Sequence, residues 1–208
     1  METTWQQTSR TRVVQSAYIV LVWFTLALVG SISRSFIPSR LGEAPLLFGI
    51  AATGPVILFV AGYLLSRGWR DFVGSLIGDP WGITALQAYR ALGVVFLVQF
   101  GRGMLPAAFA LPAGVGDILI GVTAPLVALA WSSRTRSGNI VFVLWNVLGM
   151  LDLIMALSLG VLQPPTSTIT SVLVFPLSLI PTFAVPFSLI LHVAGLGQFW
   201  RSTRKQAG

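Results

Sequence analysis

The sequence has no cysteine, one histidine and one lysine among its 208 residues. Without cysteine, disulfides, thiol redox chemistry and cysteine-ligated metal sites are excluded. A single histidine, His192, excludes an HExxH zinc site and a bis-histidine haem within one protomer. The only lysine, Lys205, lies in the C-terminal tail, which excludes a retinal Schiff base inside a helix. The sequence therefore predicts no metal site and leaves any cofactor unassigned.

Charge of either sign is also scarce. Charged residues make up 9% of the chain and hydrophobic residues 55%, whereas a soluble domain carries about 25% charged residues. Such a chain has too little polar surface to cover a globular core in water. The apolar residues come in runs close to the ~20 residues that cross a bilayer as a helix. We expect an all-α integral membrane protein whose main partner is the lipid bilayer.

The net charge of +7 does not indicate nucleic-acid binding. The arginines are dispersed through short segments between the apolar runs, which is typical of charge flanking membrane helices rather than of a phosphate-binding face. No G-x-S-x-G or Walker A motif is present, and the glycines of Pro112–Ile118 lack the G-x-G-x-x-G spacing. The sequence thus favours anionic lipid over nucleic acid as the partner of its positive charge.

The apolar runs predict a single polytopic domain over residues 1–208, a bundle of about six transmembrane helices. The expected spans are 13–33, 46–66, 80–101, 113–131, 140–161 and 172–200. Proline predicts kinks in the second span, at Pro55, and in the sixth, which contains Pro176, Pro181 and Pro186. The first span resembles a signal peptide but is longer than usual, so we expect it to stay uncleaved. Residues 104–111 are apolar for a loop, and a re-entrant segment there remains open.

Lysine and arginine are distributed unequally between the two sides of the predicted bundle. If the N-terminus is cytoplasmic, nine lie on that side: Arg10, Arg12, Arg67, Arg70, Arg134, Arg136, Arg201, Arg204 and Lys205. The opposite side has three: Arg34, Arg40 and Arg102. Because cytoplasmic loops carry the excess of positive charge, both termini are expected in the cytoplasm and the chain in the inner or plasma membrane of the cell.

Few polar side chains fall inside the predicted spans, and each is costly there. Insertion scales assign a charge at the helix centre at least ~2.5 kcal/mol. From the helix rise, Arg90 and Asp152 both lie near the middle of their spans, which predicts a pair at the membrane midplane. Asp117 is expected nearer the outer interface, paired with Arg102.

On the inner side, Asn146 and His192 fall at similar depths. The six residues Arg90, Asp152, Asp117, Arg102, Asn146 and His192 are thus predicted in three layers and are the candidates for a substrate or ion path.

Small residues share the helix faces of both aspartates. Gly114, Asp117, Gly121, Ala124 and Ala128 follow helical spacing, as do Gly149, Asp152, Ala156 and Gly160. Small residues let membrane helices approach closely, so both aspartates should point into the bundle. The same faces could join two copies of the chain, or the chain and a membrane-complex partner. A buried arginine–aspartate pair can also serve only to fix helix register.

Three function classes remain open. The first is a small transporter or channel for a small solute or ion with a polar midplane site. The second is a non-catalytic accessory or assembly subunit, in which the charges lock helices together. The third is a membrane enzyme acting on a lipid or quinone. An enzyme needs at least two convergent catalytic groups, which the expected layers separate, so enzymatic activity is the least favoured.

Overall fold

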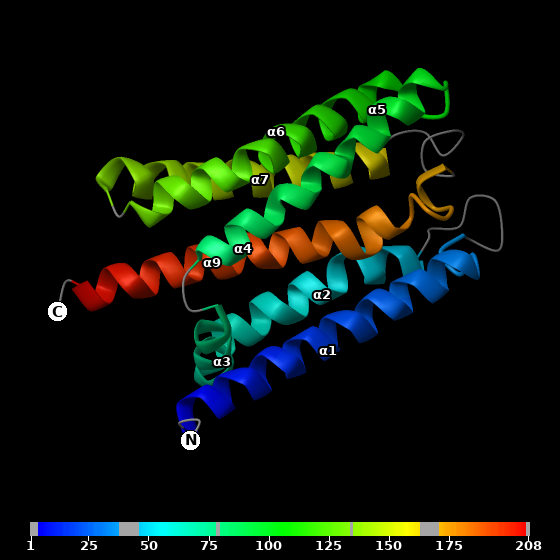
Figure 1. Ribbon diagram of the computed structural model, residues 1–208. Helices are drawn as coiled ribbons and strands as arrows, with labels where there is room; N and C mark the ends of the chain where they lie inside the picture. The colour runs from blue at the N-terminus through cyan, green and yellow to red at the C-terminus, as the bar shows by residue number, and fades with distance from the viewer. Residues whose placement is uncertain (1–3, 38–45, 78–79, 134, 163–170, 207–208) are drawn as a thin grey trace.

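The computed structural model describes residues 4–37, 46–77, 80–133, 135–162 and 171–206. Within them, six helical segments are long and apolar enough to cross a membrane. Arg40, Arg134 and the connection 163–170 lie outside the described residues. In Figure 1, the helix that begins the described chain and the helix that ends it have these ends on the same side of the bundle. The sequence predicts six helices of membrane-spanning length and hydropathy, and this number is confirmed in the described residues.

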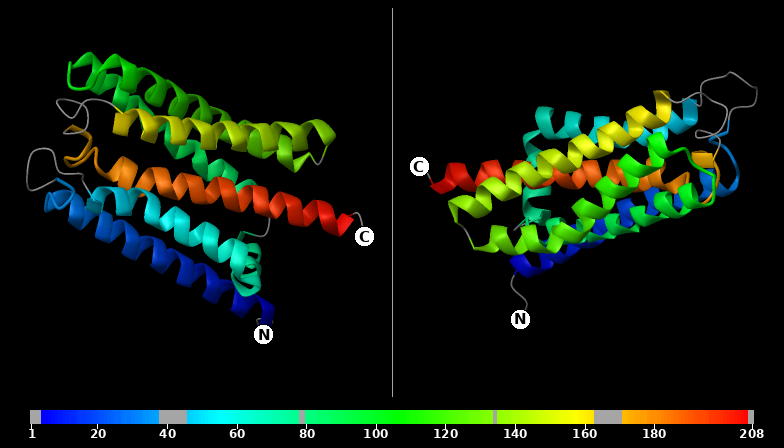
Figure 2. Two further views of the ribbon diagram at one scale, coloured as in Figure 1. Left: turned by 180° about the vertical axis from the view of Figure 1, so that it is seen from behind. Right: turned by 90° about the horizontal axis from the view of Figure 1, so that it is seen from above.

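The helices form two groups around the last one. In chain order they are α1 (Thr4–Ile32), α2 (Leu46–Leu65), α3 (Arg67–Ile77), α4 (Trp81–Leu86), η1 (Gln87–Gly93), α5 (Val94–Gly101), α6 (Ala107–Ser132), α7 (Arg136–Leu162), η2 (Ile180–Ala184) and α9 (Val185–Gln206). Figures 1 and 2 show α9 between the pair α1–α2 and the group formed by α5, α6 and α7. The end of α9 and the beginning of α1 mark what we call the terminal end of the bundle, and the other is the distal end.

The third span changes its helical type in the middle. It is α-helical in α4 and α5, but η1 between them is a 3₁₀-helix of seven residues. Runs of 3₁₀-helix longer than three or four residues are uncommon, and within a helix they often mark a hinge or strain. The sequence predicted the span but not this change.

The fourth span begins earlier than predicted. Helix α6 starts at Ala107, after Pro106 in an extended conformation, and contains Pro112 and Pro125. Residues 107–111 are its first turns, so they do not form a re-entrant segment. The prediction of a start at 113 was wrong because Pro112 removes one backbone donor without ending the helix.

The sixth span begins later than predicted. Residues 173–178 all form turns and a bend, and a π-helix over Ile180–Ala184 leads into α9. A proline nitrogen carries no hydrogen, so a carbonyl four residues before it needs another donor, and π-type bonding offers one a residue further on. The Thr182 hydroxyl also donates to the carbonyl of Ser178, at 2.6 Å. A continuous helix from 172 was therefore the wrong expectation.

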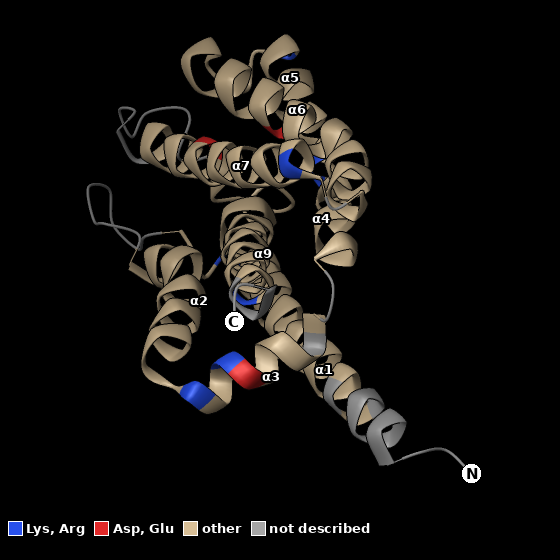
Figure 3. Ribbon diagram, turned by 90° about the vertical axis from the view of Figure 1, so that its left-hand side faces the viewer, with Lys and Arg blue, Asp and Glu red and all other residues tan. Residues whose placement is uncertain are grey.

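Helix α3 crosses the terminal end of the bundle. Figure 3 looks at this end and shows residues of both charges on α3, in a bundle that is mostly uncharged. The Arg70 guanidinium donates to the carbonyls of Tyr63 and Leu64 at the end of α2, at 2.9 and 2.8 Å. Asp71 accepts from Arg201 of α9 at 3.1 Å. A cation at the carbonyl end of a helix is favourable, and these bonds fix α3 against α2 and α9.

Candidate functional site: a buried ion network beside an apolar cavity

Arg90 is the centre of the polar network inside the bundle. Its Nε donates to Oδ1 of Asp117 on α6 at 2.7 Å, and its Nη2 donates to Oδ2 of Asp152 on α7 at 2.5 Å. Its side chain is 2% exposed, against 14% for Asp117 and 11% for Asp152. The guanidinium is thus held between two carboxylates from two helices, and the predicted pair of Arg90 and Asp152 is present.

The hydrogen bond of the third Arg90 nitrogen, Nη1, fixes which ring nitrogen of His192 carries the proton. Arg90 Nη1 lies 3.2 Å from Nε2 of His192 and donates to the carbonyl of Gly149 at 3.3 Å. Arginine has no acceptor, so Nε2 must accept this bond and carries no proton. The proton lies on Nδ1, which donates to Oδ1 of Asn146 at 2.9 Å, and Asn146 Nδ2 donates to the carbonyl of Phe142. His192 is therefore neutral, and both its ring nitrogens are occupied.

The 3₁₀ conformation of η1 places Arg90 in this position. Residues three apart eclipse one another in a 3₁₀-helix, and the buried residues of η1 are Gln87, Arg90 and Gly93. An α-helix would rotate these three positions progressively around its axis. The local tightening therefore directs one continuous face of the segment toward α6 and α9.

Glycines of neighbouring helices make room for each polar group. A Cβ at Gly93 would overlap Asp117, and one at Gly116 would overlap the carboxylate of Asp152. A Cβ at Gly149 would lie 2.5 Å from the His192 ring and 3.2 Å from Arg90 Nη1. These glycines are needed for close approach, because a side chain at any of them would displace a member of the network.

The predicted layers of polar residues are not present. Asp117 binds Arg90 and not Arg102, which lies exposed in the turn after α5. The prediction was wrong because α6 starts at Ala107, so Asp117 lies ten residues into it, roughly 15 Å from its beginning. His192 was expected near the inner surface but is fully buried. Arg90, Asp117, Asp152, Asn146 and His192 form one connected network.

A second group of polar residues was missed by the sequence analysis. Gln87 donates through Nε2 to the carbonyl of Ser188 at 3.1 Å and accepts from the Ser188 hydroxyl at 2.9 Å. The Tyr89 hydroxyl donates to the carbonyl of Ala184 at 2.8 Å and lies in contact with the Ser188 hydroxyl. These bonds tie η1 to the π-helical end of α9. The polar residues beside Arg90 in sequence were the available signal.

The small-residue face of α6 packs against another segment of the same chain. Gly114, Gly121, Ala124 and Ala128 are all buried. A Cβ at Gly121 would overlap the backbone of Ala91 in η1. Small residues allow this contact, as they do between membrane helices generally. The face thus packs η1 and α6 together, with Asp117 one turn from its beginning.

A cavity of about 550 Å³ reaches the network from the distal half of the bundle. Its walls come from the first turns of α2, the beginning of α6, the end of α7 and the segment around η2. The lining is apolar except for Asp117 and Thr53. Asp117 therefore belongs both to the ion network and to the cavity wall.

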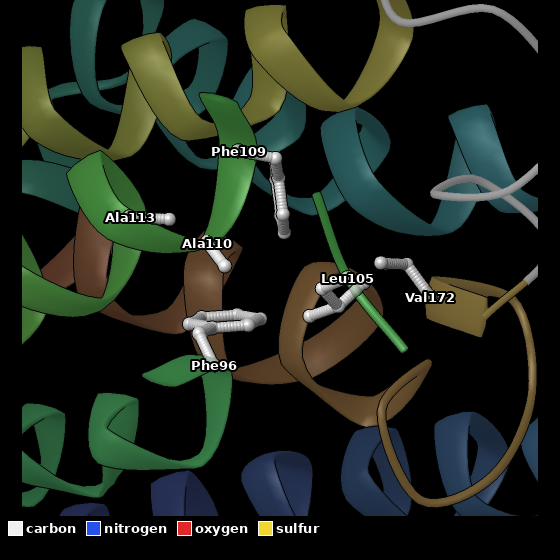
Figure 4. Close-up of a cluster of buried hydrophobic side chains, with 6 residues drawn as sticks. All are labelled: Phe96, Leu105, Phe109, Ala110, Ala113 and Val172. Carbon is white, nitrogen blue, oxygen red and sulfur yellow. The ribbon is translucent and has the colours of Figure 1, made fainter. Parts of the chain in front are cut away.

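Hydrophobic clusters lie on both sides of the network. In Figure 4, Phe96, Leu105, Phe109 and Val172 point toward one another on the distal side. Three of these, Phe96, Phe109 and Val172, also line the cavity.

The terminal half is packed by a second cluster: Ile120, Ala124, Val127, Trp131, Phe142 and Trp145. The Trp145 ring lies 5.2 Å from that of His192, between centroids. The network is thus closed toward the terminal end by aromatic packing and borders empty space toward the distal end.

Comparison with known proteins gives a family but no activity. Across the described residues, no group of three or more histidine, aspartate or glutamate side chains could hold a metal ion. No curated protein and no solved structure matches the chain. One family model covers the chain from the beginning of α2 almost to the end of α9, and so includes the whole network. The chain belongs to this family, a domain of unknown function (DUF8737) that matches residues 47–199.

Proposed function

We propose that this protein is a multi-pass transporter of the cell membrane that moves a small solute through the middle of its bundle. The observation that supports this best is the double role of Asp117, which lines the cavity and is ion-paired to Arg90. Intramembrane charges that face a cavity are characteristic of transport pathways. A purely structural ion pair has no need of a cavity beside it.

The asymmetry of the bundle supports the same proposal. Empty space lies on the distal side of the network, and aromatic packing lies on the terminal side. Transporters bind their substrates near the midplane, beside discontinuous helices, and expose the site to one side at a time. The discontinuous segments here are η1 and η2, which both border the network or the cavity. They are the positions where the bundle would change shape.

The charge distribution gives the proposed orientation. Within the described residues, eight of the ten lysines and arginines that flank the spans lie at the terminal end, so we place both termini in the cytoplasm. The cavity then faces the outside of the cell. An enzyme gains less support, because His192 uses both ring nitrogens in hydrogen bonds and does not line the cavity.

Cysteine accessibility tests whether the cavity is an aqueous path. The chain has no native cysteine, so Ala52→Cys on α2 and Ala156→Cys on α7 each introduce one thiol on the cavity wall. The control is Ala124→Cys, in the packed terminal half. A membrane-impermeant methanethiosulfonate should modify both cavity cysteines from outside and spare the control. Only a hydrated thiol ionises and reacts, and unfolded protein checks that all three thiols are competent.

The opposite results would replace the proposal. If both cavity cysteines stay unmodified from either side, the cavity is dry or filled by lipid. The charges would then be architectural, and the accessory-subunit hypothesis would stand in place of transport. If the cavity cysteines react only from the cytoplasmic side, the proposed orientation is wrong.

A further inference from the structure

The ion network contains more negative than positive charge. In the part of the chain that the structure describes, Arg90 is bonded to both Asp117 and Asp152, and His192 is neutral. One positive charge thus faces two carboxylates. Helix α2, helix α5 and the η2 segment, which complete the walls, contain no charged residue and no histidine. The titratable groups around Asp117 are therefore Arg90 and Tyr89 of η1, Asp152 of α7 and His192 of α9.

A single uncompensated charge is unstable in a buried, apolar place. Two carboxylates that share one arginine cannot both ionise freely, and one of them keeps a proton unless a second cation arrives. His192 cannot take that proton easily, because its Nε2 accepts from a cationic guanidinium. The proton therefore belongs to a carboxyl group of Asp117 or Asp152. Of these two, Asp117 lines the cavity.

The cavity has the chemistry to replace that proton with a cation. Three phenylalanines, Phe48, Phe96 and Phe109, line it, and aromatic faces attract cations, most strongly where water is excluded. The remaining wall is almost wholly apolar, which favours an apolar body around the charge. An anion would face the excess carboxylate, and a strongly hydrated metal ion would find few oxygen ligands.

We infer that the cavity is a binding site for a monovalent apolar cation, such as an alkyl or aryl ammonium or phosphonium ion, which exchanges with one proton of the network. In the exchange, the protonated carboxyl group releases its proton to water, and the cation pairs with the carboxylate that is left. The net charge of the network and its ligand is zero before and after the exchange. This inference rests on the proposed transport function and gives it a substrate class and a coupled ion.

The test uses two ions of the same shape and opposite charge. The full chain, in detergent micelles, is titrated with tetraphenylphosphonium and with tetraphenylborate in a calorimeter. Each titration is run at one pH in two buffers with different heats of ionisation, so that the difference reports protons released. The variants are Asp117→Asn and, as a matched control, Asp71→Asn, which removes an exposed carboxylate on α3 far from the cavity.

The phosphonium should bind saturably and release up to one proton, and the borate should not bind at the site. Asp117→Asn should weaken phosphonium binding at least tenfold and abolish the proton release, whereas Asp71→Asn should change neither. Equal binding of the two ions, binding unaffected by Asp117→Asn, or binding without proton release would each overturn the inference. If the cysteines of Ala52→Cys and Ala156→Cys are accessible but the phosphonium does not bind, the transport proposal is retained and the proposed substrate class is wrong.

Discussion

The charge balance of the network predicts an unusual order of stabilities among its variants. Asp117→Asn keeps the size of the side chain and an oxygen that accepts from Arg90. It leaves one arginine with one aspartate, so the buried charge is balanced. The acceptor loses its charge but still accepts from the guanidinium, a loss of about 1 kcal/mol. We expect the free energy of unfolding to stay within that margin, and the same for Asp152→Asn.

Removing the arginine should have a far larger effect. Arg90→Met removes the cation that binds Asp117 and Asp152, whose oxygens lie 2.7 and 2.5 Å from its nitrogens in the wild type, and so leaves a buried carboxylate without a partner. Breaking a buried pair by removing one partner costs about 3–5 kcal/mol, or roughly two to four orders of magnitude in the unfolding constant. The double variant Asp117→Asn/Asp152→Asn strands Arg90 and should lose a similar amount. The triple variant, which adds Arg90→Met, removes every charge of the network. It should recover most of the free energy of unfolding that the double variant loses.

Unfolding in mixed micelles titrated with dodecyl sulfate, followed by circular dichroism, measures these differences. The wild type and the two single asparagine variants should unfold at nearly the same detergent fraction, and Arg90→Met and the double variant should unfold much earlier. If either single asparagine variant is as unstable as Arg90→Met, charge balance does not control this network. Full additivity in the triple variant would show that the three side chains do not interact.

Three further predictions concern the rest of the bundle. Gly121→Ala should lower the free energy of unfolding by about 1–3 kcal/mol in the same titration, because its Cβ overlaps the backbone of Ala91. Gly101→Ala is the control, because a Cβ added there would meet no atom of another segment within 4 Å, and it should leave the free energy of unfolding unchanged. Equal effects of the two variants would disprove the close packing of η1 on α6. Asp71→Ala should change the free energy of unfolding by less than about 1 kcal/mol, since the Asp71 side chain is 77% exposed; a larger loss would give α3 a greater structural role. Reporter fusions after Gln7 and at Gly208 should both report the cytoplasm, and an external signal from either would reverse the proposed topology.

The pair of Arg90 and Asp152 could be predicted from depth alone. Both residues lie near the centres of long apolar runs, and an arginine side chain spans several ångströms. The partner of Asp117 could not be predicted in this way. Its depth depended on where α6 begins, and the predicted start at 113 treated Pro112 as a break although the helix continues through it. An error of six residues there moved Asp117 by roughly 9 Å along the helix axis.

The sequence by itself determined that the chain belongs in a lipid bilayer and how many of its helices are long enough to cross it. Hydropathy is a sum over adjacent residues, so a run such as Leu46–Leu65 specifies a membrane helix whatever surrounds it. The bias of lysine and arginine is a similar sum over loops, and it predicts the orientation without any contact between helices.

Only the tertiary structure decided what the polar residues do together. The 3₁₀ segment η1 turns Gln87, Arg90 and Gly93 onto one face, and glycines on other helices leave space for the carboxylates and the imidazole. Backbone hydrogen bonding in η1 and the rotation of α6, α7 and α9 about their axes arise from packing between segments up to a hundred residues apart. Local sequence fixes how deep a residue lies in its helix, but only packing fixes which helix it faces.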